Sequence, residues 1–172
     1  MNKNRITVEQ DGSLMTFITE AHENYIVLVQ YITYNLSSIR IPDDIGGIPV
    51  REIGDCCFFN HPEITEIVFS KNLRTIGNSA FALCKGITEL YLPDGISEIG
   101  NYAFCDCTRL QKIVLPASLK VLKQGVFAFS YLSDDVDITL NEGLETIQSG
   151  VFSSGGLNSF FTVKMPSSVK EC

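Results

Sequence analysis

Few side chains in this 172-residue sequence could carry chemistry, chiefly two histidines and six cysteines. A nucleophilic thiol needs a base beside it. His61 precedes Cys84 by a spacing that recurs along the chain, so the two side chains could meet in the folded protein. We favour a buried polar pair in a turn over a catalytic dyad, because Cys107 and Ser130 stand at the equivalent positions further along. The cysteines are Cys56, Cys57, Cys84, Cys105, Cys107 and Cys172.

The cysteine spacings are not those of a metal site. Zinc sites recruit cysteine pairs separated by two to four residues, together with histidine. Here Cys56 and Cys57 are adjacent, and one residue separates Cys105 from Cys107. A disulfide between neighbouring repeats is within reach, although parallel side chains disfavour the bond. We therefore expect reduced thiols that fill space in the interior.

The carboxylate and glycine pairs are explained by turns. Asp43-Asp44 and Asp134-Asp135 are adjacent pairs on loops, where the side chains point apart. The second pair lacks the full spacing of a calcium-binding loop. No group of glycines forms a phosphate-binding fingerprint. The sequence thus predicts no catalytic residue, no metal site, no cofactor and no enzymatic activity.

These scattered groups sit within an internal repeat. Five phenylalanines recur at intervals of about 23 to 25 residues, and an isoleucine or leucine lies at a fixed distance ahead of each. Such self-similarity indicates stacked supersecondary units, each too short to bury its apolar side alone. The phenylalanines are Phe58, Phe81, Phe104, Phe127 and Phe152.

One repeat shows which elements must position the side chains. Leu90 and Leu92 alternate with polar residues, as in a half-buried strand, and Pro93 ends that strand. Residues 96–100 form a second short extended piece. Residues 101–107 then predict a helical or 3₁₀ turn, with its alanine and phenylalanine facing inward.

The repeated pattern Leu/Ile-x-x-Ile-x-Leu-Pro-x-x-Leu/Ile-x-x-Ile-Gly-x-x-Ala-Phe-x-x-Cys resembles the BspA-type leucine-rich repeat. Residues 64–86 and 87–109 match it closely, and residues 41–54 resemble the family's first repeat with its inserted Gly-x-Pro-Val. Later repeats depart from it, since Lys123 and Gln148 replace the glycine.

The resemblance covers residues 36–172 and implies one continuous domain. The expected fold is a mostly β, α/β solenoid: a right-handed superhelix of five to six coils, each of about 23–25 residues. A parallel strand sheet would line its concave face, with short helical or 3₁₀ turns opposite. The family is similar to surface or secreted bacterial proteins that adhere to other proteins, so the resemblance implies an adhesion module without catalytic residues.

The two ends of the chain predict different things. Residues 1–35 contain a hairpin signal at Asp11-Gly12 and a later apolar strand, which suits a cap on the first coil. Residues 161–166 predict a sixth strand, after which no polar cap follows. A loop, a second subunit or a longer chain would have to cover that open coil. A homodimer through the C-terminal coil is therefore an alternative function.

The remaining surface is the outward side of the strands, which solenoids present to ligands. Val68, Tyr91 and Val114 form an apolar column there, bordered by charged residues, as in a modest protein-binding patch. Strand propensity alone would also place such residues outward. We expect this face to bind a protein in preference to a glycan. Its residues are Glu66, Val68, Glu89, Tyr91, Lys112, Val114, Asp137 and Thr139.

Charge and hydropathy limit which partners the protein could bind and where in or on the cell it could lie. The net charge is −7 and the 13 basic residues are scattered, which argues against nucleic acid. No apolar stretch approaches the roughly 20 residues of a membrane-spanning helix. The resemblance implies the cell surface or secretion. The N-terminus, however, lacks the apolar region of a signal peptide, and reduced thiols favour the cytoplasm as the alternative.

Overall fold

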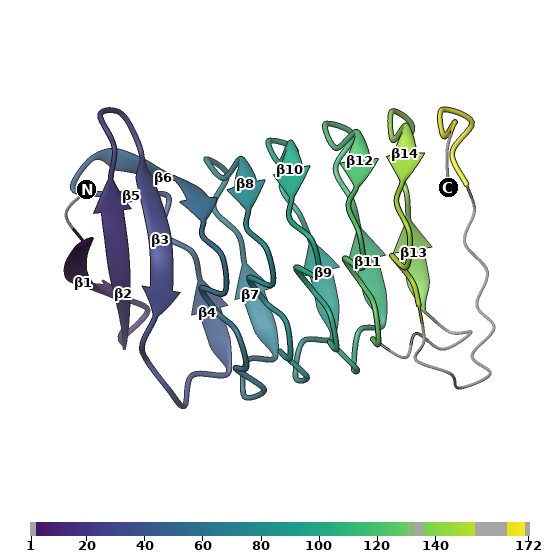
Figure 1. Ribbon diagram of the computed structural model, residues 1–172. Coiled ribbons are helices and arrows are strands. Elements are labelled where there is room, and N and C mark those ends of the chain that lie inside the picture. The colour runs from purple at the N-terminus through teal and green to yellow at the C-terminus, as the bar shows by residue number, and fades with distance from the viewer. Residues whose placement is uncertain (1–2, 131, 133–135, 154–164, 171–172) are drawn as a thin grey trace.

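Successive turns of the chain, here called coils, stack side by side from an N-terminal hairpin toward the C-terminus (Figure 1). The computed structural model describes residues 3–130, 132, 136–153 and 165–170. Each coil contributes one strand to each of two parallel rows. The first row holds β4 (Ser38–Arg40), β7 (Glu66–Val68), β9 (Glu89–Tyr91), β11 (Lys112–Val114) and β13 (Asp137–Thr139). The second row holds β6 (Ile48–Ile53), β8 (Thr75–Ile76), β10 (Glu98–Ile99), β12 (Val121–Leu122) and β14 (Thr146–Ile147).

Equivalent residues of consecutive coils pair in register. Leu90 of β9 stands opposite Ile113 of β11, which stands opposite Ile138 of β13. Each row is interrupted once: β7 does not pair with β9, and β10 does not pair with β12. The two interruptions fall at different steps of the stack, so the first row divides nearer the N-terminus than the second.

The repeated phenylalanines form a column of stacked rings through the core. Phe58, Phe81, Phe104 and Phe127 are at most 1% exposed. Adjacent rings from Phe58 to Phe152 lie within 17° of parallel, with centroid separations of 4.8, 5.3, 5.8 and 5.8 Å. The predicted solenoid of repeated coils is confirmed in this column, because each ring covers the apolar side of its neighbour.

The predicted helical or 3₁₀ turns are wrong. The arcs that carry the phenylalanines are turns, and the described residues contain no helix of any type. Alternate amides explain the difference, since Phe58 N donates to Ala80 O of the next coil at 2.8 Å, whereas Phe59 N donates to Cys56 O of its own arc at 3.1 Å. Cys56 and Asn60 have φ of 55° and 60°, which breaks a right-handed helical run. The fold is therefore a β solenoid, and its handedness stays a prediction.

An antiparallel hairpin and a third strand cover the first coil. β1 (Lys3–Gln10) pairs with β2 (Ser13–Ala21), and β2 pairs with β3 (Ile26–Tyr31), which runs parallel to β6. Phe17 lies 6.2 Å from Phe58 between ring centroids, so the hairpin packs onto the aromatic column. The structure has the hairpin at the predicted turn, whereas the division of the chain at residue 35 stays a prediction. β5 (Asp44–Ile45) forms a short hairpin with β6.

The interior thiols fill space and donate to backbone carbonyls. Cys84 Sγ donates to Phe58 O at 3.0 Å, and Cys107 Sγ donates to Phe81 O at 3.3 Å. Burial raises the pKa of Cys84 to about 12 and raises those of Cys57 and Cys107 as well. The five described cysteines are free thiols, and Cys172 lies outside the described residues.

Two further sequence predictions fall at the C-terminal end. The predicted sixth strand spans residues 161–166, of which 161–164 lie outside the described residues, and Met165 and Pro166 are not in a strand. Asp134-Asp135 also lies outside them. Among the residues that are described, no helix is long and apolar enough to cross a membrane.

Candidate binding site on the strand face

The strand face is the solvent side of the first row of strands. Because side chains alternate along a strand, Ile67 and Leu90 point into the core while their neighbours point outward. Tyr91 is 50% exposed, and Val68, Lys112 and Val114 are partly exposed. The structure places all eight predicted residues on this side, namely Glu66, Val68, Glu89, Tyr91, Lys112, Val114, Asp137 and Thr139.

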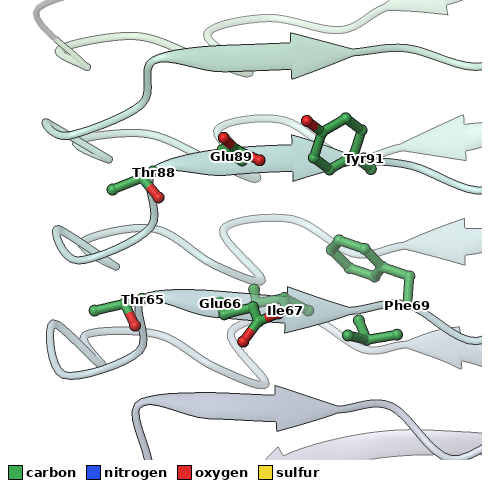
Figure 2. Close-up of a pocket in the computed structure, with 8 residues that line it drawn as sticks. Thr65, Glu66, Ile67, Phe69, Thr88, Glu89 and Tyr91 are labelled. Carbon is green, nitrogen blue, oxygen red and sulfur yellow. The ribbon is translucent and has the colours of Figure 1, made fainter.

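A hollow lies where the first row is interrupted. It has a volume of about 560 Å³ and opens between β7 and β9, with Tyr91 on one side and Phe69 on the other (Figure 2). Four of the predicted residues line it. Sequence reasoning missed the other four, because nothing in the repeat tells which two strands fail to pair. The lining residues are Thr65, Glu66, Ile67, Val68, Phe69, Thr88, Glu89 and Tyr91.

The N-terminal hairpin supplies a wall of a second, adjoining hollow. This second hollow, of about 300 Å³, shares Glu66 and Val68 with the first and is lined beyond them by Gln10, Asp11 and Arg40, among others. Arg40 Nε lies 3.9 Å from Asp11 Oδ2, which ties the hairpin turn to β4. This wall could not be found from the sequence, because only the fold brings the hairpin beside the strand face.

Charges along the strand face are paired at one end and unpaired at the other. Lys112 Nζ lies 3.7 Å from Asp137 Oδ2 and 5.7 Å from the centroid of the Tyr91 ring. Tyr91, followed by Asp137, raises the pKa of Lys112. Neither Glu66 nor Glu89 has an ion pair within the described part of the chain; Glu66 Oε2 only accepts a hydrogen bond from Ser38 Oγ at 2.8 Å.

The predicted pairing of His61 with Cys84 takes a different form. The imidazole Nδ1 lies 2.8 Å from Glu63 Oε1, and the ring stacks on Tyr34 with centroids 5.3 Å apart. The Cys84 thiol donates instead to a backbone carbonyl, that of Phe58. Across the described ranges, no three His, Cys, Asp or Glu side chains gather closely enough to hold a metal ion.

The C-terminal coil offers the competing surface. A hollow of about 260 Å³ lies between β13 and the segment at Met165, whose side chain is 42% exposed. Glu142 accepts hydrogen bonds from the backbone N and the hydroxyl of Ser167, at 3.2 and 3.0 Å, and these bonds lower the pKa of Glu142. The last described segment thus packs on the coil before it, and the predicted dimer stays a prediction.

A comparison with protein families identifies the repeat. A family model described as a BspA type leucine-rich repeat region matches residues 51–172 in six copies. That range covers more than two thirds of the chain. No protein of curated function matches the sequence.

Solved structures share the fold. A leucine-rich repeat protein of T. pallidum is 27% identical, with a TM-score of 0.65 over 78% of this chain and 69% of that one. One from Eubacterium ventriosum is 18% identical, with a TM-score of 0.71 over 95% of this chain and 46% of that one. A leucine-rich cell surface protein from Faecalibacterium prausnitzii is 20% identical, with a TM-score of 0.62 over 96% of this chain and 50% of that one. The chain thus spans about half the length of the last two.

Proposed function

The chain belongs to the BspA-type leucine-rich repeat family, and from this we propose that it is a non-catalytic binding module that recognises a protein through its strand face. The family is a repeat scaffold without enzymatic activity. The observation that carries the proposal is the hollow between β7 and β9, where a half-exposed Tyr91 stands beside two carboxylates without ion pairs within the described residues.

The composition of the site favours a protein over a glycan. Aromatic anchors in partly closed pockets supply most of the binding energy in protein interfaces, and charged residues sit at the rim. Tyr91 provides such an anchor, Val68 and Val114 continue its apolar column, and Lys112 and Asp137 lie at the border.

The same proposal places the module at the cell surface. One of the structures with this fold is a cell surface protein, and adhesion is a role in which a rigid, extended face suits a macromolecular partner. A cytoplasmic location is the alternative, because the thiols of Cys57, Cys84 and Cys107 are reduced and buried.

A peptide selection tests the proposed function. Peptides enriched from a random display library on the native chain should bind Tyr91→Ala at least about tenfold more weakly, as expected for loss of an aromatic anchor. Tyr102→Ala is the matched control, since Tyr102 is a 37% exposed tyrosine on an arc, away from the strand face. Enriched peptides that bind Tyr91→Ala as tightly as the native chain would refute the proposal.

Self-association through the C-terminal coil is the second candidate, supported by the exposed Met165 beside Pro166. Light scattering over a concentration series tests it. The assembly hypothesis requires a dimer that Met165→Glu dissociates, because a buried unpaired charge is costly. A monomer at all concentrations would exclude it.

A further inference from the structure

We propose that the hollow between β7 and β9 receives a lysine or arginine side chain of the bound protein. The inference rests on the proposed function, since it names the chemistry of a partner at the same site. It is drawn from three features of the hollow: its charges, its free backbone carbonyls and its aromatic wall.

Two like charges stand at the same position of consecutive coils. Glu66 and Glu89 are each the first residue of their strand, and both are exposed. The equivalent residue of the next coil is Lys112, which pairs with Asp137. Two carboxylates on adjacent coils repel each other, and a cation bound between them would offset that repulsion. Lys112 forms its ion pair with Asp137 and stands opposite Glu89 in the ladder without pairing with it, and Glu66 has no ion pair within the described residues.

Backbone carbonyls add further acceptors at this step. β11 pairs with one edge of β9. At this edge Lys112 N donates to Thr88 O, and Leu92 N donates to Val114 O. Hydrogen-bonding groups of a parallel strand alternate between its two neighbours, so the carbonyls of Glu89 and Tyr91 are directed toward β7. Because β7 and β9 do not pair, those carbonyls remain available to an ammonium or guanidinium group.

The wall of the hollow suits the apolar stem of a basic side chain. Tyr91 and Val68 line it, and long basic side chains lay their methylene stems on such surfaces. The Tyr91 ring already holds one cation, since Lys112 Nζ is 5.7 Å from its centroid. In the second hollow, which shares Glu66 and Val68 with the first, Gln10 Oε1 is buried without a hydrogen-bond partner in the described structure.

The whole chain favours the same partner chemistry. Its net charge of −7 raises the encounter rate with a basic partner and lowers it with an acidic one. A neutral glycan would leave the repulsion between Glu66 and Glu89 in place. A bare metal ion is disfavoured by the lack of a third ligand among the described His, Cys, Asp and Glu side chains.

A pair of capped amino acids isolates the charge. The probes are N-acetyl-arginine methylamide and its neutral isostere N-acetyl-citrulline methylamide, titrated into the ¹⁵N-labelled native chain and followed by amide chemical shifts. We expect the arginine probe to shift Val68, Glu89 and Tyr91 with about tenfold higher affinity than the citrulline probe, as a charge-assisted contact implies. Equal responses to the two probes, or no response to either at these amides, would overturn the inference.

A matched pair of variants separates the site from the overall field. Glu89→Gln should remove most of the preference for arginine, whereas Glu145→Gln removes the same charge from an exposed residue that pairs with Lys120 at 3.9 Å and should leave the preference intact. Equal losses in both variants would reduce the effect to net charge and overturn the inference. Failure of this inference can be told apart from failure of the proposed function. Selected peptides that need Tyr91 but no basic residue would support the proposed function and not the inference.

Discussion

The aromatic rings of the coils before residue 110, here called the tight region, are stacked more closely than those of the later coils, here called the looser region. Ring centroids are 4.8 and 5.3 Å apart from Phe58 to Phe104, and 5.8 Å apart at both later steps. The second row of strands is interrupted at the same place, between β10 and β12. The repeat is also longer between Phe127 and Phe152 than between any two earlier phenylalanines of the column.

Glycine is required at one position of the early coils. A Cβ at Gly77 would lie 2.6 Å from Asp55 N, and one at Gly100 would lie 2.5 Å from Asn78 N. Lys123 and Gln148 hold the equivalent positions in the later coils. Backbone of the preceding coil therefore fills the space beside Gly77 and Gly100, whereas the later coils accommodate a side chain at this position.

A ladder of polar side chains reinforces the early coils. Asn78 N donates to Asp55 Oδ1 at 2.6 Å, and Asn101 N donates to Asn78 Oδ1 at 2.9 Å. In the later coils the direction reverses, because Gln124 N donates to Gln148 Oε1. The comparison teaches that the repeat can keep its arc backbone, with Phe81 N 2.8 Å from Ala103 O and Phe127 N 2.9 Å from Val151 O, while one glycine position and its polar neighbour change.

The largest expected effect comes from the aromatic column. Phe81→Ala removes a ring that is stacked on both sides in the tight region, and it should lower the free energy of unfolding by about 3–5 kcal/mol. Phe152→Ala, at a partly buried ring in the looser region, should cost less than half as much. Urea unfolding of both variants measures this, and equal losses would contradict the difference between the regions.

A substitution at the glycine position tests the difference between the two regions more selectively. Gly100→Ala places a methyl group against backbone and should cost about 1–3 kcal/mol. Lys123→Ala, at the equivalent position of the next coil, loses a partly exposed side chain whose ammonium group pairs with Glu98, and it should cost under about 1 kcal/mol. Thermal unfolding of the two variants and the native chain measures both losses. A larger loss of stability in Lys123→Ala than in Gly100→Ala would contradict the role of the glycine position.

The sequence predicts best those structural features that repeat along the chain or follow from local turn chemistry. The column of Phe58 to Phe152 and the outward position of Tyr91 follow from spacing and alternation, and both are found. The hairpin at Asp11-Gly12 follows from turn chemistry, and it is found too. The arcs at Cys56 and Asn60 were predicted as helical because their local composition cannot show amides that bond to the next coil.

The candidate site was only half predictable. Four lining residues of the hollow follow from strand alternation, whereas the other four join them because β7 and β9 do not pair, namely Thr65, Ile67, Phe69 and Thr88. Gln10 lines the second hollow because the hairpin folds beside β4. Both depend on how separate coils fit together, which no single repeat encodes.

Alkaline pH should destabilise the tight region through its buried thiols. An unfolded thiol ionises near pH 9, whereas Cys84 in the folded chain has a pKa of about 12 and stays neutral. A raised folded pKa gives stability that is complete below pH 9 and is lost as pH rises from 9 toward 12, by up to about 1.4 kcal/mol per pH unit for each thiol.

The check is urea unfolding at pH 8 and pH 10 for the native chain and for Cys84→Ala. The variant is less stable at both pH values, but it should lose less stability between them. An unchanged difference would mean that Cys84 does not contribute. A thiol reagent at pH 8 should label the exposed Cys56 well before Cys57 or Cys107.

The smallest expected effect lies in the C-terminal coil. Glu142 has a lowered pKa because Ser167 donates to it, so its contribution is present above the ordinary carboxyl range and is lost as pH falls through the lowered pKa. Amide exchange at Lys170 and Gly143, corrected for the pH dependence of the intrinsic exchange rate, should therefore accelerate on acidification. Ser167→Ala should accelerate it already at neutral pH, and an unaffected rate would contradict the role of this contact.

The central claim is that a protein ligand is bound where the first row of strands divides. The most direct test is hydrogen–deuterium exchange of the native chain with and without a peptide from the display selection. The account predicts protection at residues 65–69 and 88–91, with the arcs at 79–83 and 102–106 unchanged. Protection confined to the arcs, or to residues 138–142 and 165–170 of the C-terminal coil, would contradict it.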